Sequence, residues 1–577
     1  MKLINRIDKI SLITLILSVL YLVAGNVLSS YSLIGSIADF AFKIVVFLYI
    51  IATFLRYSDR SRKIGHDLRD ILFLAILLSI IFAKFLTPDF LSSGIFRTLV
   101  ALIIAVRCFL VFFSAEDGKS ARSISANALN NPAKTILLSY VVAIFFGSFL
   151  LSISAATADG YVISFIDALF TSTSAICVTG LTVVDISSRF SRFGQIVVLL
   201  LIQIGGLGVM ILSYFSAFLV GKKKLSLEDK ITISYLLNDA EASSLSKKVR
   251  KIIYISLLIE GVGALLLLVF FIAKMGFSLN TVFFSIFHSV SAFCNAGFAL
   301  FPDSLVRYVG SFYFNFTIAS LIVLGGLSFR VIVNSREFLI YKFKVNILKK
   351  NSPYVSLSTN TVVVLLITVI LIVSGTLLIY FFEHKSTLLK LDIKTQYLSC
   401  FFQSVSVRTA GFNTLDFSSF TVPTYLIIIV FMLIGGASGS TAGGIKVNTV
   451  GVIFSYLASF FKESDKVVIF NKMISKEVVL KSFMIVLLSL FAVFISTLIL
   501  SVTENFKFIQ ILFEAASAFG TAGLSTGITP DLSFFGKLTI IFLMIAGKVG
   551  PLTLLAATSH KTEENNVEYP ETNINIT

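Results

Sequence analysis

The chain has 577 residues, of which 56% are hydrophobic and 14% are charged, and its mean hydropathy is +0.94. This composition excludes a soluble globular protein and indicates an all-α polytopic membrane protein. The net charge of +16 could suit a nucleic-acid-binding protein, but eight Lys and Arg residues lie between 220 and 251 and six between 330 and 350. Basic residues gathered between spans mark the cytoplasmic side, so we expect no nucleic acid partner.

The first part of the chain predicts a separate membrane module. Because a bilayer-crossing helix needs about 20 apolar residues, residues 1–114 are expected to form four transmembrane helices. A polar linker rich in Ser, Ala and Asn follows at 115–134. Arg97 and Arg107 lie in the fourth span, but a voltage-sensing helix needs several basic residues at shorter intervals. An anchor packed beside the main body is therefore favoured.

Eight further spans are expected after the linker, which gives twelve in all. This even number and the basic residues before the first span place both termini in the cytoplasm. The eight spans group into four units at 135–220, 221–333, 334–462 and 463–557, followed by a cytoplasmic tail at 558–577. The spans are expected near 135–154, 193–219, 252–273, 309–332, 359–382, 421–460, 478–502 and 534–557.

A four-residue glycine motif occurs once in each unit. Successive motif glycines are 117, 114 and 112 residues apart. Each motif follows an apolar segment too short to cross the bilayer, which predicts a re-entrant pore helix. The short segments lie at 162–176, 278–293, 395–406 and 506–519. The motifs are Val178-Thr179-Gly180-Leu181, Asn295-Ala296-Gly297-Phe298, Thr409-Ala410-Gly411-Phe412 and Thr521-Ala522-Gly523-Leu524.

These motifs predict an ion selectivity filter. Backbone carbonyls that replace the hydration shell of a cation require dihedral angles that glycine tolerates. One such motif would more simply be a turn, whereas four in equivalent places favour a cation filter. A second glycine cluster follows each motif, where helices can approach closely or bend at a common depth. These clusters are Gly205-Gly206, Gly325-Gly326, Gly435-Gly436 and Gly547.

A carboxylate follows each motif glycine by five to eight residues. The four carboxylates are Asp185, Asp303, Asp416 and Asp531. Opposite the basic loops they would form an acidic vestibule, in which each attracts a monovalent cation by roughly 0.5 kcal/mol at about 8 Å in water. Capping the next helix is an equally good role for any one of them.

Other polar residues lie in or beside the short segments. Arg408 directly precedes the third motif, while Asp167 and Glu514 lie in the first and fourth segments. We expect Arg408 to brace the filter from behind by pairing with a neighbouring carboxylate. Glu260 lies in mid-span without an evident partner. His288 is expected to be a packed polar residue, because no second ligand lies at metal-site spacing.

The expected span at 421–460 contains a glycine-rich run, 435–446. Since each glycine costs a helix about 1 kcal/mol relative to alanine, five glycines should break this span into two halves, although a kink is the simpler alternative. Lys548 lies in the last span, where a central charge costs roughly 2.5 to 3.5 kcal/mol. It should therefore face the pore or a partner.

Several stretches of the chain resemble the Trk/Ktr/HKT superfamily of potassium transporters, in particular the membrane subunits of bacterial Ktr and Trk systems. The resemblance covers about residues 135–557. Its most specific pieces are SAICVTGLTVVD (174–185), RTAGFN (408–413), GGASGSTAGGIK (435–446) and GKVGPLT (547–553).

The resemblance implies four hairpins around one pore with pseudo-fourfold symmetry. A glycine in all four filter positions goes with potassium preference, whereas some sodium-transporting relatives have serine at the position of Gly180. The glycine-rich run would be an intramembrane gate, and Lys548, where the family commonly has arginine, would project toward it as a positive barrier. The implied gate residues are Gly435, Gly436, Ser438, Gly439, Ser440, Thr441, Gly443, Gly444, Lys446 and Lys548.

The resemblance also implies a lipid-embedded homodimer in the plasma (inner) membrane, controlled by a cytosolic nucleotide-binding subunit. The basic segments 220–251 and 330–350 are candidate docking surfaces for that subunit. No nucleotide-binding glycine loop is present, so neither enzyme activity nor a cofactor is expected in this chain. A sodium-permeable or sodium-coupled transporter of the same superfamily is the alternative. A secondary solute carrier is a second one, but it would show paired inverted halves.

Overall fold

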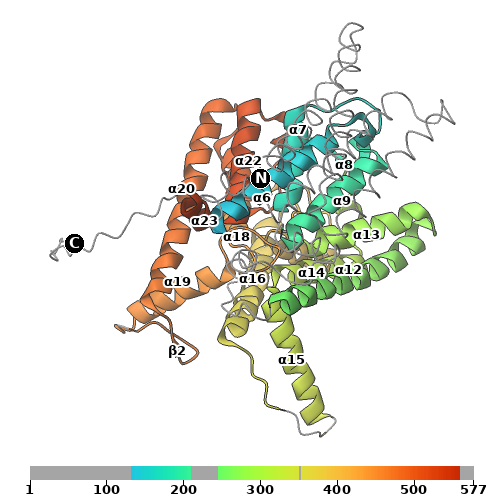
Figure 1. Cartoon of the computed structure of the whole chain (residues 1–577). Helices are drawn as coiled ribbons and strands as arrows, with labels where there is room; N and C mark the ends of the chain where they lie inside the picture. Colours follow the sequence, from blue (N-terminus) through green and yellow to red (C-terminus); the bar gives the residue numbers. More distant parts are fainter. Residues whose placement is uncertain (1–131, 209–244, 348, 350–352, 465, 559–577) are drawn as a thin grey trace, which may run out of the picture.

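The computed structural model describes residues 132–208, 245–347, 349, 353–464 and 466–558. The expected four-helix module, nearly all of the linker, most of the basic segment 220–251 and the tail after Thr558 lie outside the described residues. Within the described part, the chain consists almost entirely of helices (Figure 1).

The described helices follow one order four times. A long helix comes first, then a short helix, the glycine motif and a second helix. The long helices are α6 (Pro132–Leu151), α12 (Leu245–Met275), α16 (Thr359–Glu383) and α20 (Lys476–Thr503). The short helices are α7 (Phe165–Cys177), α13 (Leu279–Phe293), α17 (Ile393–Ser406) and α21 (Phe508–Gly520). The second helices are α9 (Arg192–Leu207), α14 (Phe312–Gly326), α18 (Val422–Leu433) and α22 (Phe534–Val549).

The short helices begin where the sequence supplies a capping side chain. Ser164, Ser278 and Asp392 each accept a hydrogen bond from the backbone N–H three residues later, which satisfies a donor that the first helical turn leaves open. The helices α7 and α21 end at Val178 and Thr521, whose left-handed backbone cannot continue a right-handed helix. A side-chain cap thus marks the start of α7, α13 and α17, and a left-handed residue follows the end of α7 and α21.

The four units close into a ring. The second helix of each unit packs against the short helix of the next one, in the pairs α9 with α13, α14 with α17, α18 with α21, and α22 with α7. The last pair returns from the fourth unit to the first. A fully buried phenylalanine occupies the equivalent place in every short helix, and these four are Phe170, Phe287, Phe402 and Phe513. The core therefore surrounds the short helices.

Two of the expected spans are bent helix pairs in the structure. The helix expected at 309–332 ends at Gly326, and α15 (Phe329–Asn346) continues after a bend of 107°. The last one bends by 96° between α22 and α23 (Pro551–Thr558), since Gly550 has φ +91° and proline starts a helix more easily than it continues one. The basic segment 330–350 is therefore mostly helix α15, which projects from the body (Figure 1).

The expected span at 421–460 is broken, as its glycines predict. Helix α18 ends at Leu433, and the next helix, α19 (Val447–Phe460), begins only at Val447. Three helices among the described residues are long and apolar enough to cross a membrane, or five if each bent pair is one span, so the number of spans stays a prediction. The minor elements are α8 (Ile186–Arg189), η1 (Ser154–Ala156), η3 (Val306–Tyr308), η4 (Phe417–Ser419), η5 (Thr529–Asp531), β1 (Val468–Ile469) and β2 (Lys472–Met473).

Candidate functional site

The four motif glycines meet at one place, which we call the glycine ring (Gly180, Gly297, Gly411 and Gly523). Each glycine lies so close to the backbone of the next unit that an added Cβ would touch a carbonyl oxygen there. The distance from the added Cβ to the carbonyl oxygen would be 2.5 Å for Gly180 and Ala296 O, 2.7 Å for Gly297 and Ala410 O, 2.9 Å for Gly411 and Ala522 O, and 2.0 Å for Gly523 and Thr179 O. Segments more than 100 residues apart thus form a closed circle.

The backbone of the four motifs has the same unusual conformation. The ring glycines have φ values of 94°, 69°, 78° and 77° in chain order, which glycine alone adopts without strain. The residue two positions earlier is also left-handed, although it carries a side chain, and these residues are Val178, Asn295, Thr409 and Thr521. A strand turns successive carbonyls to opposite sides, whereas such backbone can gather them on one side.

Serine side chains at the ends of the short helices hold three motifs from behind. Ser174 Oγ accepts from Gly180 N at 3.1 Å, Ser291 Oγ donates to Phe298 O at 2.8 Å, and Ser406 Oγ donates to Phe412 O. The serine lies six residues before the ring glycine in the first two units but five before it in the third. The stretch between the serine and the ring glycine is therefore one residue shorter in the third unit.

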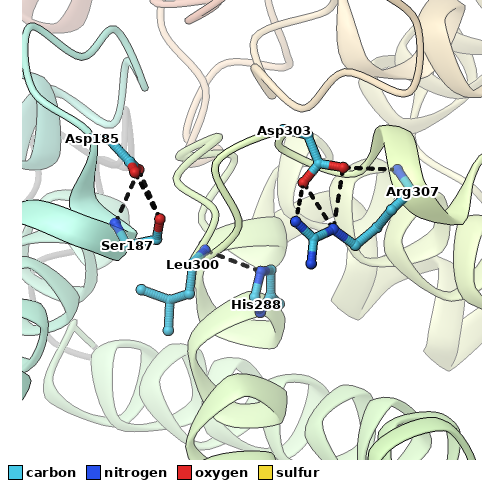
Figure 2. Close-up of polar contacts among 6 residues, drawn as sticks. All are labelled: Asp185, Ser187, His288, Leu300, Asp303 and Arg307. Carbon is cyan, nitrogen blue, oxygen red and sulfur yellow. Dashed lines mark hydrogen bonds and ion pairs between the residues drawn. The ribbon is translucent and has the colours of Figure 1, made fainter.

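A second polar side chain in each of three short helices holds the segment that leaves the ring. Leu300 N donates to His288 Nε2 at 3.3 Å (Figure 2), and Thr526 N donates to Glu514 at 3.0 Å. Gln403 accepts from Thr414 N at 2.8 Å when its amide is oriented to satisfy its neighbours.

His288 is packed as expected, with Nδ1 2.7 Å from Phe284 O and the ring stacked on Phe301. The sequence reasoning missed Gln403, which lies eight residues before its ring glycine, whereas His288 and Glu514 lie nine before theirs.

The expected ion pair of Arg408 is wrong. Its side chain is 8% exposed, and its Nε has no hydrogen-bond partner in the described part of the chain. The carboxylates that could have paired with it are already engaged. Asp167 forms an ion pair with Lys537 at 2.7 Å, and Glu514 accepts from Thr526 N and from Thr529 Oγ1.

The carboxylates that follow the motifs have local partners in three of four units. Asp185 caps the next short helical turn by accepting from Ser187 N at 3.0 Å (Figure 2). Asp416 caps the corresponding turn of the third unit by accepting from Ser418 N at 3.0 Å. Asp303 accepts from Arg307 Nε at 2.8 Å, and this bond holds the pKa of Asp303 below its usual value. Asp531 is exposed in η5. The capping alternative thus applies to Asp185 and Asp416.

The interrupted helix of the third unit forms a loop, 434–446, which we call the crossing loop. Its ends are joined, because Ile434 pairs with Ile445. Thr441 N and Thr441 Oγ1 donate to Gly325 O at 3.3 and 3.0 Å, which ties the loop to the end of α14. Gly444 N donates to Gly547 O at 3.1 Å and so ties it to α22. The crossing loop therefore bridges the second and fourth units.

Two lysines hold neighbouring carbonyls of the crossing loop. Lys548 Nζ donates to Thr441 O, and Lys446 Nζ donates to Ala442 O at 2.6 Å. Gly443 N also donates to Thr521 Oγ1 at 3.1 Å, and Thr521 is the first residue of the fourth motif. The loop is thus bonded directly to one motif of the ring. At its tip, Ser438 and Gly439 are exposed.

Glu260, for which the sequence suggested no partner, binds Gln203. Gln203 Nε2 donates to both carboxylate oxygens at 3.1 Å, and Ser289 Oγ donates to the backbone carbonyl of Glu260 at 2.6 Å. This contact joins α9 of the first unit to α12 and α13 of the second. It is a buried polar link between units rather than a part of the ring.

Apolar helices that enclose a closed circle of irregular, glycine-containing backbone are typical of helical membrane transporters, in which such backbone lines an aqueous path. Comparison with known proteins then identifies the family. The family model described as cation transport protein (TrkH) matches residues 102–569. The chain belongs to this family, which consists of transporters and not of enzymes.

Individual relatives cover most of the chain. It is 36% identical to the Ktr system potassium uptake protein B of Bacillus subtilis over 76% of this chain and 95% of that protein. The protein of the same description from Vibrio alginolyticus is 37% identical over 80% and 97%. The potassium/sodium uptake protein NtpJ of Enterococcus hirae is 36% identical over 77% and 97%.

A solved structure has a similar fold. The potassium transporter TrkH from Vibrio parahaemolyticus superposes with a TM-score of 0.62 and covers 85% of this chain and 96% of its own. At 19% identity, this likeness concerns the fold alone.

Proposed function

We propose that this chain takes up potassium ions across the plasma (inner) membrane through the glycine ring, whose four motifs act as a carbonyl-lined selectivity filter. The observation that carries the proposal is the closed circle of four glycines with positive φ. Backbone carbonyls at such a circle can replace the hydration shell of K⁺. A membrane potential of 100 mV would favour inward movement by roughly 2.3 kcal/mol.

The crossing loop is proposed as the gate below this filter. Its hydrogen bonds to Gly325 O, Gly547 O and Thr521 support this role, since they hold the loop between opposite units. Lys548 would add a positive barrier while it fixes Thr441 O. Opening would require the exchange of these hydrogen bonds for others, each with a net value of about 1 kcal/mol.

An acidic vestibule at Asp185, Asp303, Asp416 and Asp531 is proposed as the entrance. The cation attraction should be weak, because the Arg307 guanidinium compensates the charge of Asp303 and two others cap helical turns. Salt at physiological strength reduces it further. Selectivity is therefore assigned to the glycine ring.

We also propose a homodimer controlled by a cytosolic nucleotide-binding subunit. Two relatives carry the description of a protein of the Ktr system, which supports a multi-component assembly. Helix α15 is the candidate docking surface, because it projects from the body and carries Arg330, Arg336, Lys342 and Lys344. Both termini would then lie on the cytoplasmic side.

Growth rescue tests the proposal. A bacterial strain that lacks potassium uptake should grow at limiting potassium when it produces this chain, and more so together with its regulatory subunit. A Gly297→Ala variant is the matched control, because it changes only the ring. Failure of the wild-type chain to support growth or K⁺ uptake with every tested subunit would contradict the proposal.

Sodium transport is the second candidate, because one relative is described as a potassium/sodium uptake protein. The Gly180→Ser variant separates the two readings. If the chain prefers potassium, this substitution should lower the ratio of K⁺ to Na⁺ uptake. Equal uptake of both ions by the wild-type chain would favour the sodium-permeable alternative.

A further inference from the structure

We propose that His288, Gln403 and Glu514 position the outer part of the filter and thereby contribute to its preference for potassium over sodium. These residues occupy one equivalent place in three short helices, nine residues before the ring glycine in the second and fourth units and eight before it in the shortened third. The inference rests on the proposed function of the glycine ring as the ion path.

The geometry is the same in the three units. Each side chain is fully buried and accepts a hydrogen bond from the backbone N–H of the residue three positions after the ring glycine. These donors are Leu300 N at 3.3 Å, Thr414 N at 2.8 Å and Thr526 N at 3.0 Å. Because each bond starts in the rigid short helix and ends just beyond the ring, it limits rotation of the peptide groups between them.

The chemistry of the three side chains identifies the shared requirement. An imidazole, an amide and a carboxylate have a hydrogen-bond acceptor in common and little else. Glu514 has the greatest need for donors, since a buried carboxylate is costly unless it is hydrogen-bonded, and it also accepts from Ser525 Oγ and Thr529 Oγ1. The geometry shared by the three units thus points to restraint of the backbone and not to direct ion binding.

The first unit provides an internal control. Thr171 is its equivalent residue, but Thr171 Oγ1 donates to Asp167 O within its own helix at 2.8 Å. The segment after Gly180 is therefore held without this bond. Restraint of the outer segment differs between the first unit and the other three, although the ring itself closes in all four.

Restraint matters because selectivity depends on the number and direction of the carbonyls that an ion meets. A peptide group that rotates freely removes its carbonyl from the path and admits water beside the ion. Sodium, with its stronger hydration, would gain from such looseness. Loss of one acceptor should therefore change the ratio of potassium to sodium uptake more than it changes the amount of folded protein.

The test compares paired substitutions in the full-length chain, produced in a potassium-uptake-deficient strain with uptake normalised to membrane abundance. Gln403→Leu removes the acceptor, while Gln403→Glu retains it. We expect Gln403→Leu to lower the ratio of Rb⁺ to Na⁺ uptake about tenfold, as the loss of a buried hydrogen bond implies, and Gln403→Glu to keep most of it. Thr171→Val should leave the ratio unchanged.

A second pair, His288→Phe against His288→Gln, decides the matter if Gln403→Leu does not reach the membrane. An unchanged ratio in Gln403→Leu or His288→Phe would overturn the positioning role and leave the proposed function intact. Failure of the wild-type chain to take up Rb⁺ would instead overturn the proposed function.

Discussion

The third unit differs from the other three in how its second helix meets the ring. In the first, second and fourth units, Gly205, Gly325 and Gly547 press against the carbonyl at the end of their own short helix, where an added Cβ would lie 1.7 to 2.0 Å from the oxygen. The equivalent Gly435 instead lies against Gly443 O of the crossing loop, where an added Cβ would be 1.9 Å from the oxygen. In the third unit the crossing loop therefore lies where the second helix of the other units contacts its own short helix.

This difference shows that one unit of a repeated architecture can be held by a loop where the other three are held by helix packing. Three units are locked by helix packing that tolerates no side chain, whereas the third is held by hydrogen bonds from a glycine-rich loop. The same unit has one residue fewer between its short-helix serine and its ring glycine. It also contains Arg408, whose Nε has no hydrogen-bond partner among the described residues. We therefore predict that regulation acts mainly through this quarter of the ring.

The largest effect should come from Gly523→Ala. Its Cβ would lie 2.0 Å from Thr179 O at a φ of +77°, so the fourth motif must shift and potassium uptake should fall to the level of empty cells. Gly411→Ala in the third unit, at 2.9 Å from Ala522 O, should retain more. Gly160→Ala is the control, since it has similar φ but open space. Normal potassium uptake by Gly523→Ala would contradict the close approach of the four motifs in the glycine ring.

Release of the crossing loop should have the next largest effect. Lys548→Met removes the charged donor to Thr441 O, a bond worth about 1.5 to 3 kcal/mol, and should raise potassium flux by up to about tenfold. Flux into vesicles checks this, with the exposed Lys472→Met of β2 as control. A lower flux at normal abundance would mean that Lys548 supports the path rather than closes it.

Substitutions at the boundary between the fourth and first units should reduce stability more than a substitution at Arg408 in the third unit. Lys537→Met breaks the ion pair with Asp167, whose side chains are 14% and 21% exposed, and should cost about 2 kcal/mol. Arg408→Met should cost less than about 1 kcal/mol, because it removes a buried charge without an ion-pair partner among the described residues.

Thermal unfolding of the detergent-purified protein measures both. The double variant with Asp167→Asn should recover part of the loss in Lys537→Met. A larger loss in Arg408→Met than in Lys537→Met would reveal a partner for Arg408 and bring the third unit closer to the others.

The smallest effect concerns the mouth of the second unit. Arg307→Gln frees Asp303, so apparent potassium affinity should rise by about twofold at most at low salt and not at high salt. Arg307 lowers the pKa of Asp303, so the carboxylate is ionised above its ordinary pKa and protonates only as pH falls through the lowered value. In Arg307→Gln it should protonate at higher pH, which a pH series of uptake would detect; identical profiles would exclude the interaction.

The sequence predicted the units better than their internal contacts. The bounds of a short apolar helix depend on residues close to it in the sequence, such as its capping residues and the glycine motif after it. The helices α7, α13, α17 and α21 therefore lie close to the expected ranges. The break at 435–446 followed from glycine content for the same reason. The glycine clusters allowed bends in the second helices, but the sequence did not show which of these helices bend. Apolar residues continue through Gly326 and Gly550, and hydropathy alone does not distinguish a straight helix from a bent one.

Partners across units could not be read from the sequence. Glu260 with Gln203 and Lys537 with Asp167 join residues 57 and 370 positions apart, and only packing selects them. The same applies to Arg408, whose expected carboxylates bind other groups. Gln403 was hidden because the third unit is one residue shorter, which shifts it from the register of His288 and Glu514.

Ion flux into liposomes that contain only the purified full-length chain and the proposed regulatory subunit tests the central claim most directly. At an inward-directed potential, K⁺ flux should exceed Na⁺ flux, and Gly523→Ala should abolish it while Gly160→Ala preserves it. Equal K⁺ and Na⁺ flux, or undiminished flux through Gly523→Ala, would contradict the assignment of the glycine ring as the potassium filter.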